Sequence, residues 1–170
     1  MKISSKGIQF IKNEEGFKEN AYQDSVGVWT IGYGTTYYEN GTRVKKGDKM
    51  SRAEADRILV KQLSTVYEPV IKQTVKKPLN QNQYDALSSL IYNIGGTAFR
   101  GSTLLKRINE DPNSGTVLSE IQRWKFAGSK PILLGRRVRE VNLYSSKSGL
   151  DTKALVIILI AVTACFLLSK

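Results

Sequence analysis

Hydrophobic periodicity changes twice along this 170-residue chain, and the order of the changes limits the folds open to it. Apolar residues first recur at helical spacing over residues 4–15, and Gly16 is suited to end that helix. Residues 18–45 instead carry aromatic and β-branched residues between glycines, with a turn signal at Asn40-Gly41. This stretch predicts a small antiparallel sheet of three short strands.

The remainder of the chain is predicted to be almost entirely helical. Ser51-Arg52-Ala53-Glu54 has the form of a capping box that starts a helix, and Pro69 should kink it or start a new segment. From Leu79 the helical spacing resumes, and further helices are expected near 102–109, 115–125 and 136–146. One helix, a small sheet and then many helices predict an α+β fold of two lobes with a cleft between them.

Two residue counts exclude whole classes of chemistry. The chain has no histidine, which removes Ser-His-Asp sites, Cys-His sites and zinc sites with histidine ligands. Its single cysteine, Cys165, excludes an intrachain disulfide. The net charge of +11 favours a polyanionic partner such as an anionic membrane or a bacterial wall polymer. No nucleic-acid partner is expected, because helix-turn-helix, zinc and RNP-like patterns are missing.

Acid–base chemistry must therefore come from carboxylates or a few other side chains, and two acids near the first helix are candidates. Glu15 falls in the last turn of that helix, where the helix dipole disfavours a negative charge and so favours a proton donor. Asp24 and Thr30 follow in the sheet region. Carboxyl groups in contrasting environments are the usual equipment of a glycosidase. A solvated Glu and a turn-forming Asp are the simpler interpretation of the spacing alone.

The motifs around these residues resemble those of bacteriophage-type lysozymes (endolysins, glycoside hydrolase family 24). That family carries an E-x8-D-x5-T catalytic set, which matches Glu15, Asp24 and Thr30. The resemblance spans residues 5–146. The segments that carry it are EG at 15–16, AYQD at 21–24, TIGYGTT at 30–36, LNQNQYDAL at 79–87, YNIG at 92–95, STLL at 102–105, RW at 123–124 and LGRR at 134–137.

The resemblance implies a lysozyme-like catalytic domain over residues 1–150 that cleaves the β-1,4 bond between N-acetylmuramic acid and N-acetylglucosamine in bacterial peptidoglycan. It implies that Glu15 is the general acid and that Asp24 and Thr30 place the attacking water. The family is usually described as inverting. A monomer without metal or cofactor is expected.

Further site residues follow from position within the family motifs. Thr36, Tyr92 and Thr103 resemble substrate-binding residues of the cleft, although Tyr92 could equally belong to the core. Either Arg136 or Arg137 is a candidate partner for Glu15, with a plain surface role as the alternative.

Two departures from a simple match concern the residues after Thr30. Thr35 stands where the family often has histidine, which bears on fine substrate contacts. The aromatic residues of this stretch could stack on sugars, but alternate aromatics suit the packing of strands better. They are Trp29, Tyr33, Tyr37 and Tyr38.

The C-terminal segment, residues 151–170, is predicted to be an apolar helix that anchors the chain in a membrane. Residues 154–168 carry no charge, and ten of these fifteen are Leu, Ile, Val or Phe. As a helix they span ~22 Å, less than a ~30 Å hydrocarbon core, so a buried core helix is the alternative. Lysines on the N-terminal side favour a cytoplasmic catalytic domain, which conflicts with action on the wall. Release of the tail, a separate pore or a membrane-containing virion would each resolve this conflict.

The main alternative function is non-catalytic: a cationic protein that disrupts walls or membranes on a lysozyme scaffold. An intact set of Glu15, Asp24 and Thr30 argues against it, because a binding scaffold has no chemical need for them. A lytic transglycosylase can work with one glutamate, so the same set also favours hydrolysis.

Overall fold

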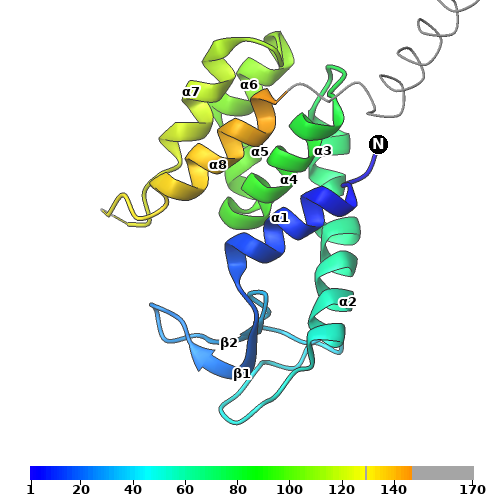
Figure 1. Cartoon of the computed structure of the whole chain (residues 1–170), viewed down its shortest axis with the longest axis vertical. Helices are drawn as coiled ribbons and strands as arrows, with labels where there is room; N and C mark the ends of the chain where they lie inside the picture. Colours follow the sequence, from blue (N-terminus) through cyan, green and yellow to red (C-terminus); the bar gives the residue numbers. More distant parts are fainter. Residues whose placement is uncertain (129, 147–170) are drawn as a thin grey trace, which may run out of the picture.

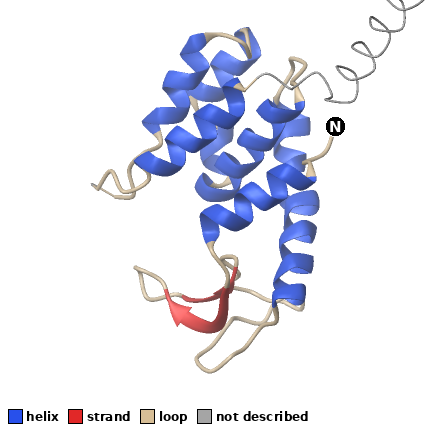
Figure 2. Ribbon diagram, in the orientation of Figure 1, coloured by secondary structure: helices blue, strands red, loops and turns tan. Residues whose placement is uncertain are grey.

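The computed structural model describes residues 1–128 and 130–146, and it has the expected two lobes (Figures 1 and 2). The predicted tail helix and the boundary at residue 150 lie outside the described residues. Within the described part of the chain, no helix is long and apolar enough to cross a membrane. The elements are α1 (Ser5–Glu15), β1 (Lys18–Gln23), β2 (Trp29–Gly32), α2 (Arg52–Gln62), the π-helical turn η1 (Leu63–Tyr67), α3 (Glu68–Thr74), α4 (Gln81–Ile94), α5 (Gly96–Arg100), α6 (Thr103–Glu110), α7 (Gly115–Arg123) and α8 (Leu134–Ser145).

Helix α1 ends where the sequence predicts. The Ser4 side chain caps its start by accepting a hydrogen bond from the Gly7 amide at 3.1 Å. Gly16 adopts a φ of 67°, and its amide donates a hydrogen bond to the Lys12 carbonyl. The chain turns out of the helix at this residue. Glu15 is therefore the last helical residue, and the chain passes from it directly into the sheet lobe (Figure 1).

The sheet has two strands among the described residues, where the sequence predicted three. Strands β1 and β2 pair antiparallel, with Tyr22 opposite Thr30. After β2 the chain folds back on itself, since Ile31 and Thr35 exchange two backbone hydrogen bonds of 2.9 Å. The following segment therefore forms no third strand among the described residues: it makes isolated bridges between Tyr37 and Arg43 and between Lys49 and Asn20 of β1.

A long helical rod joins the two lobes, and its middle is a π turn. Helices α2, η1 and α3 follow without a break, and the Glu68 amide bonds the Leu63 carbonyl five residues back. Pro69 has no N–H to give to the Thr65 carbonyl, and its ring would clash with that carbonyl in a regular helix. The wider turn before Pro69 accommodates it, which is the interruption that the sequence predicted.

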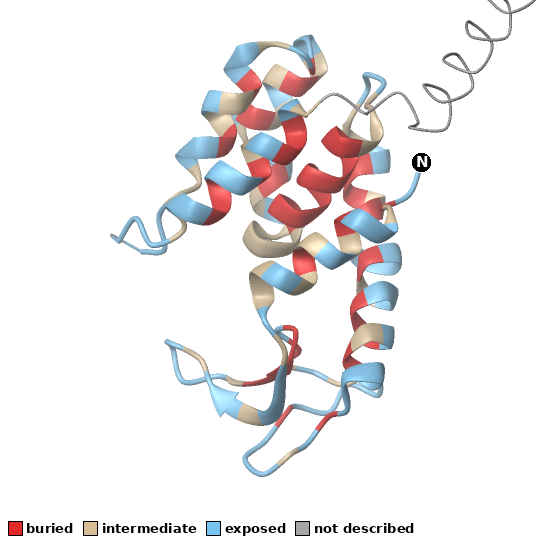
Figure 3. Cartoon of the chain, in the orientation of Figure 1, coloured by how far each residue is buried: buried red, intermediate tan, exposed pale blue. Residues whose placement is uncertain are grey.

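The helical lobe is built around α4, which packs against α1 and α8. Asn80 and Gln83 form a capping box at its start, and Gly95 ends it with a φ of 85°. Every residue from Asn82 to Ile91 is buried, so α4 is covered on all sides. Figure 3 shows the buried positions gathered in this lobe, while the sheet lobe is largely exposed.

Candidate active site

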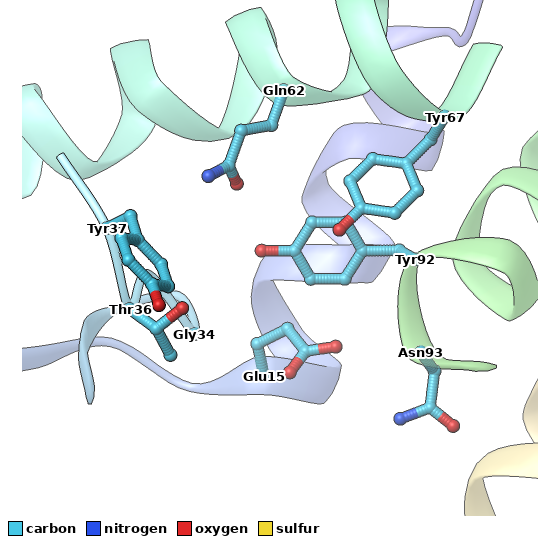
Figure 4. Close-up of a pocket in the computed structure, with 8 residues that line it drawn as sticks. All are labelled: Glu15, Gly34, Thr36, Tyr37, Gln62, Tyr67, Tyr92 and Asn93. Carbon is cyan, nitrogen blue, oxygen red and sulfur yellow. The ribbon is translucent and has the colours of Figure 1, made fainter. Parts of the chain in front are cut away.

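A pocket of about 300 Å³ opens beside the C-terminal end of α1. Figure 4 shows Glu15 and Tyr92 facing an open space that Thr36 and Tyr37 border on the sheet-lobe side. The pocket takes its residues from α1, the loop after β2, the rod and the end of α4. They are Glu15, Gly34, Thr36, Tyr37, Gln62, Tyr67, Tyr92 and Asn93.

Glu15 presents its two carboxylate oxygens to different surroundings. Its Oε1 accepts a hydrogen bond from Arg136 Nη1 at 2.7 Å. Its Oε2 lies on the pocket side: a Cβ placed on Gly34 would be 3.9 Å from this oxygen and 3.8 Å from the Tyr92 hydroxyl. The side chain of Glu15 is 19% exposed. One oxygen is therefore fixed by the helical lobe, and the other is left beside the pocket.

Arg136 is held rigidly, because each of its guanidinium nitrogens has a partner. Its Nε donates to Glu140 Oε1 at 3.1 Å, and its Nη2 donates to the Ser89 carbonyl at 3.1 Å. The Ser89 hydroxyl in turn donates to Glu140 Oε1 at 2.7 Å. A guanidinium bound in three directions cannot change rotamer without breaking several buried bonds, so it sets the position of the Glu15 carboxylate.

Arg137, the other candidate partner for Glu15, points elsewhere. Its Nη2 donates to Asn93 Oδ1 at 2.9 Å, and its Nε lies 3.1 Å from Glu140 Oε2. Glu15, Arg136, Arg137 and Glu140 thus form a four-charge cluster with no net charge. Arg137 and Glu140 are 0% exposed.

The ionisation of the cluster follows from burial and from its neighbouring charges. Burial lowers the pKa of Arg136, but the negative charges of Glu15 and Glu140 outweigh that effect and raise it overall. Burial lowers the pKa of Arg137 and raises that of Glu140. Each group of the cluster therefore depends on its partners for its charge, and the loss of one would leave another charge buried without compensation.

Asp24 and Thr30 are brought together by the hairpin between β1 and β2. Asp24 Oδ1 accepts hydrogen bonds from the amides of Val26 at 3.0 Å and Val28 at 2.8 Å. The Thr30 hydroxyl donates to the Val28 carbonyl at 3.1 Å. Both side chains are thus fixed by one peptide segment, although neither belongs to the described lining of the 300 Å³ pocket.

Tyr22 lies on β1 opposite Thr30 and links the two acids electrostatically. Its pKa is raised by burial first, and then by the negative charges of Glu15 and Asp24. The charges of both carboxylates therefore act on the Tyr22 hydroxyl.

The predicted substrate-binding residues have different outcomes. Thr36 and Tyr92 both line the pocket. The Tyr92 hydroxyl donates to the Tyr33 carbonyl at 2.6 Å, which ties α4 to the sheet lobe. Thr103 is the first residue of α6 and is exposed, and it is not among the described residues that line the pocket.

The aromatic residues after Thr30 divide between packing and the pocket. Tyr33 is buried and Trp29 packs against the core, as expected for sheet packing. The Tyr38 hydroxyl donates to Asp48 at 3.0 Å. Tyr37, by contrast, is 46% exposed and lines the pocket, so the sequence interpretation missed its place there.

Other pocket residues also escaped the sequence analysis. Gln62 is the last residue of α2 and Tyr67 is the last residue of the π turn, so both come from the rod. Asn93 comes from the last turn of α4. The ring of Tyr67 lies 4.9 Å from that of Tyr92, and the pKa values of both are raised, by burial first and then by Glu15. Pro69 was the available signal for Tyr67, because a π turn often marks a functional site.

The arrangement suits proton transfer in a polar pocket. An oriented glutamate, an oriented aspartate and several hydroxyl groups can act as acid, base and hydrogen-bonding groups. Within residues 1–128 and 130–146, no three His, Cys, Asp or Glu side chains come together as ligands for a metal ion.

Comparisons with known proteins agree with this geometry. Residues 12–140 match the family model described as "Phage lysozyme". The endolysin of Salmonella phage P22 is 46% identical over 147 residues, which cover 86% of this chain and 99% of that protein. A crystal structure of a P22 lysozyme mutant superposes with a TM-score of 0.76 at 44% identity, covering 86% of this chain and 99% of the other.

A solved structure from outside the phages is also similar. The muramidase domain of SpmX from Asticaccaulis excentricus has a TM-score of 0.74 and 33% identity, with coverage of 86% of this chain and 99% of that domain. The family model and the P22 relative each extend over most of the chain, and the family model includes Glu15 and Arg136. The chain therefore belongs to the phage lysozyme family.

Proposed function

We propose that this chain is a muramidase, a peptidoglycan hydrolase that cleaves the β-1,4 bond between N-acetylmuramic acid and N-acetylglucosamine during lysis of a bacterial host by a phage. The observation that carries the proposal is Glu15, which is fixed by Arg136 through one oxygen and borders the pocket with the other. The phage endolysin and the muramidase domain among its relatives support the same reaction.

In the proposed mechanism, Glu15 protonates the leaving glycosidic oxygen through Oε2. Asp24 and Thr30 position and activate the attacking water on the opposite face of the sugar. The hairpin supports these roles, because it orients the Asp24 carboxylate through two amides and leaves Oδ2 free of hydrogen bonds within the described residues. The proposed outcome is inversion, which requires carboxyl groups ~6.5–9.5 Å apart to leave room for the water.

We also propose that residues 154–168 attach the enzyme to a membrane. The support is their composition, since each Leu, Ile, Val or Phe contributes ~0.3–0.6 kcal/mol toward insertion. Lys153 and Lys170 flank the apolar run and can reach the two interfaces. Fractionation with protease protection tests this proposal: protein found wholly in the soluble fraction would contradict it.

The reaction is tested by mass spectrometry of fragments released from purified peptidoglycan. Reducing muramic acid ends are expected from the wild-type protein, and they should disappear in Glu15→Gln, which keeps an acceptor for Arg136 but has no acidic proton to transfer to the leaving oxygen. Anhydro ends would indicate a lytic transglycosylase. Cell killing without glycan cleavage would favour the non-catalytic, membrane-disrupting alternative.

A further inference from the structure

Both ends of the described chain are fastened to the first turns of α4. Gln81 Nε2 donates to the Lys2 carbonyl at 3.0 Å, and the Ser4 amide donates to Asp85 Oδ1 at 2.9 Å. Asn82 Nδ2 donates to the Ser146 carbonyl at 2.9 Å. The chain therefore leaves the described domain beside the start of α4. Residues 147–153, which connect it to the apolar segment 154–168, span at most ~25 Å when fully extended.

An apolar groove of about 300 Å³ lies at this same place. Its lining comes from the end of α3, the loop into α4, the start of α4 and the N-terminal segment, and it includes two lysines. The lining residues are Met1, Ile71, Lys72, Val75, Lys77, Pro78, Leu79 and Tyr84. The groove includes Leu79 and Tyr84, and Ser146 is bound to Asn82, so the groove and the point where the chain leaves the domain lie at the same end of α4.

The chain segment that borders the groove is basic. Lys72, Lys76 and Lys77 are exposed, and the sequence has no acidic residue between Glu68 and Asp85. Those two acids are buried and already engaged: Glu68 accepts from the Ile3 amide and pairs with Lys72, while Asp85 accepts from Ser4. Within the described residues, Lys76 and Lys77 have no acidic partner.

We propose that this basic groove, residues 72–79 with the lining named above, docks the catalytic domain on anionic phospholipids. The lysines would contact the lipid phosphates, and the apolar floor would receive the upper part of an acyl chain. The inference rests on the proposed membrane attachment of residues 154–168, because the short connection then holds this face against the bilayer. A basic cluster next to a membrane segment is the usual complement of an anionic lipid surface.

Docking through the groove fixes the direction in which the enzyme points. In Figure 1 the sheet lobe lies at the opposite end of the molecule from the N-terminus and the end of α8. A domain seated on its basic groove therefore directs the sheet lobe, with Asp24 and Thr30, away from the bilayer. That is the direction in which the peptidoglycan layer lies for an enzyme on the outer face of the cytoplasmic membrane.

The test compares the affinity of the full chain for two kinds of vesicle. One is pure phosphatidylcholine, which is neutral overall, and the other contains phosphatidylglycerol, which is anionic. The double variant Lys76→Gln/Lys77→Gln removes two neighbouring lysines, of which Lys77 lines the groove, that have no acidic partner among the described residues. Lys45→Gln/Lys46→Gln is its matched control, because it removes two adjacent exposed lysines from the sheet lobe.

The wild-type chain is expected to bind both vesicles and to prefer the anionic one. The Lys76→Gln/Lys77→Gln variant should lose roughly 30-fold of that preference, and the control variant should keep it. Hydrogen exchange of peptides covering residues 70–80 should slow on anionic vesicles in the wild type. If both double variants lost the preference for anionic vesicles equally, net charge alone would explain the preference and the proposal would be overturned. A wild-type chain that shows no preference for anionic vesicles would also overturn it.

The experiments test membrane attachment, docking through the groove and muramidase activity separately. Failure to bind neutral vesicles would contradict attachment through residues 154–168, and the groove would then be judged from binding to anionic vesicles alone. Cleavage of purified peptidoglycan should be the same in both double variants, so a missing activity would count against the muramidase assignment only. Retention on anionic wall polymers that needs Lys76 and Lys77, with no effect on vesicle binding, would assign the surface to the wall and overturn the lipid proposal.

Discussion

Arg136 and Glu15 are 121 positions apart in the sequence, and their side chains meet at 2.7 Å. The arginine comes from the first turn of α8 in the helical lobe, and the glutamate ends α1 at the entrance to the sheet lobe. A single contact thus connects the candidate acid to the buried part of the protein.

Replacement of Arg136 by Met should cost about 3–5 kcal/mol of unfolding free energy, because Glu140 would keep a buried negative charge with less compensation. Peptidoglycan cleavage should fall as well, since Glu15 would lose its orientation. Chemical denaturation and rate measurements check both effects. Arg107→Met is the control in the same lobe: Arg107 is 42% exposed and its partner Glu110 is 48% exposed, so its loss should cost under about 1 kcal/mol. Similar losses in the two variants would refute the argument.

The structure separates two roles of Asp24. Asp24→Asn keeps an oxygen that accepts from the amides of Val26 and Val28, so its stability should stay near that of the wild type. Asp24→Ala loses both bonds and should cost about 1–2 kcal/mol. Activity should fall by roughly 10²–10⁴-fold in both, because neither retains a carboxylate. Denaturation curves and initial rates on peptidoglycan measure the two effects. An active Asn variant would remove Asp24 from the mechanism.

Replacement of Gly34 is predicted to affect both the stability of the backbone and the activity of the pocket. Its φ of 98° disfavours any other residue, so Gly34→Ala should cost about 1–2 kcal/mol. The added methyl group would also lie beside Glu15 Oε2 and should lower activity by roughly tenfold or more. Gly41→Ala is the matched control, because Gly41 has a φ of 81° with no atom near its missing Cβ. The control should lose stability and keep its activity, which thermal unfolding and rate assays can compare.

Stability should fall at alkaline pH through the tyrosines. Burial, together with Asp48, raises the pKa of Tyr38 from 10.0 to about 12. The unfolded chain therefore loses its tyrosine proton first, and the contribution of Tyr38 to stability, fully present below pH 10, is lost as the pH rises to about 12. Denaturation at a series of pH values, followed with tyrosinate absorbance, measures this. Tyr38→Phe should show a shallower decline, and an unchanged decline would contradict the assignment.

Local signals predicted most element boundaries. Gly16 ends α1 and Ser51 starts α2 as their chemistry suggests, because capping depends on a few neighbouring residues. The third strand was wrong, since the pairing of a strand depends on where the preceding turn sends the chain. The exchange of bonds between Ile31 and Thr35 sends it away from the sheet.

The site was predictable to the extent that it follows a motif. Glu15, Thr36 and Tyr92 line the pocket, and Arg136 is the arginine that reaches Glu15. The catalytic roles of Glu15, Asp24 and Thr30 stay predictions. Gln62 and Asn93 could not be found from the sequence, because their local patterns are those of ordinary helices, and the one available signal for Tyr67 was Pro69. Only the packing of the rod against α1 and α4 brings them to the pocket.

The four-charge cluster bears on the stage of synthesis and folding at which the enzyme can become active. Its members come from α1 and α8, the first and last helices described, and Ser89 of α4 holds it together. A growing or partly folded chain that lacks α8 has a Glu15 with no arginine to orient it. Competence to cut the wall should therefore arise only when the domain closes on its own last helix, so that newly made chains stay harmless until synthesis has passed residue 140.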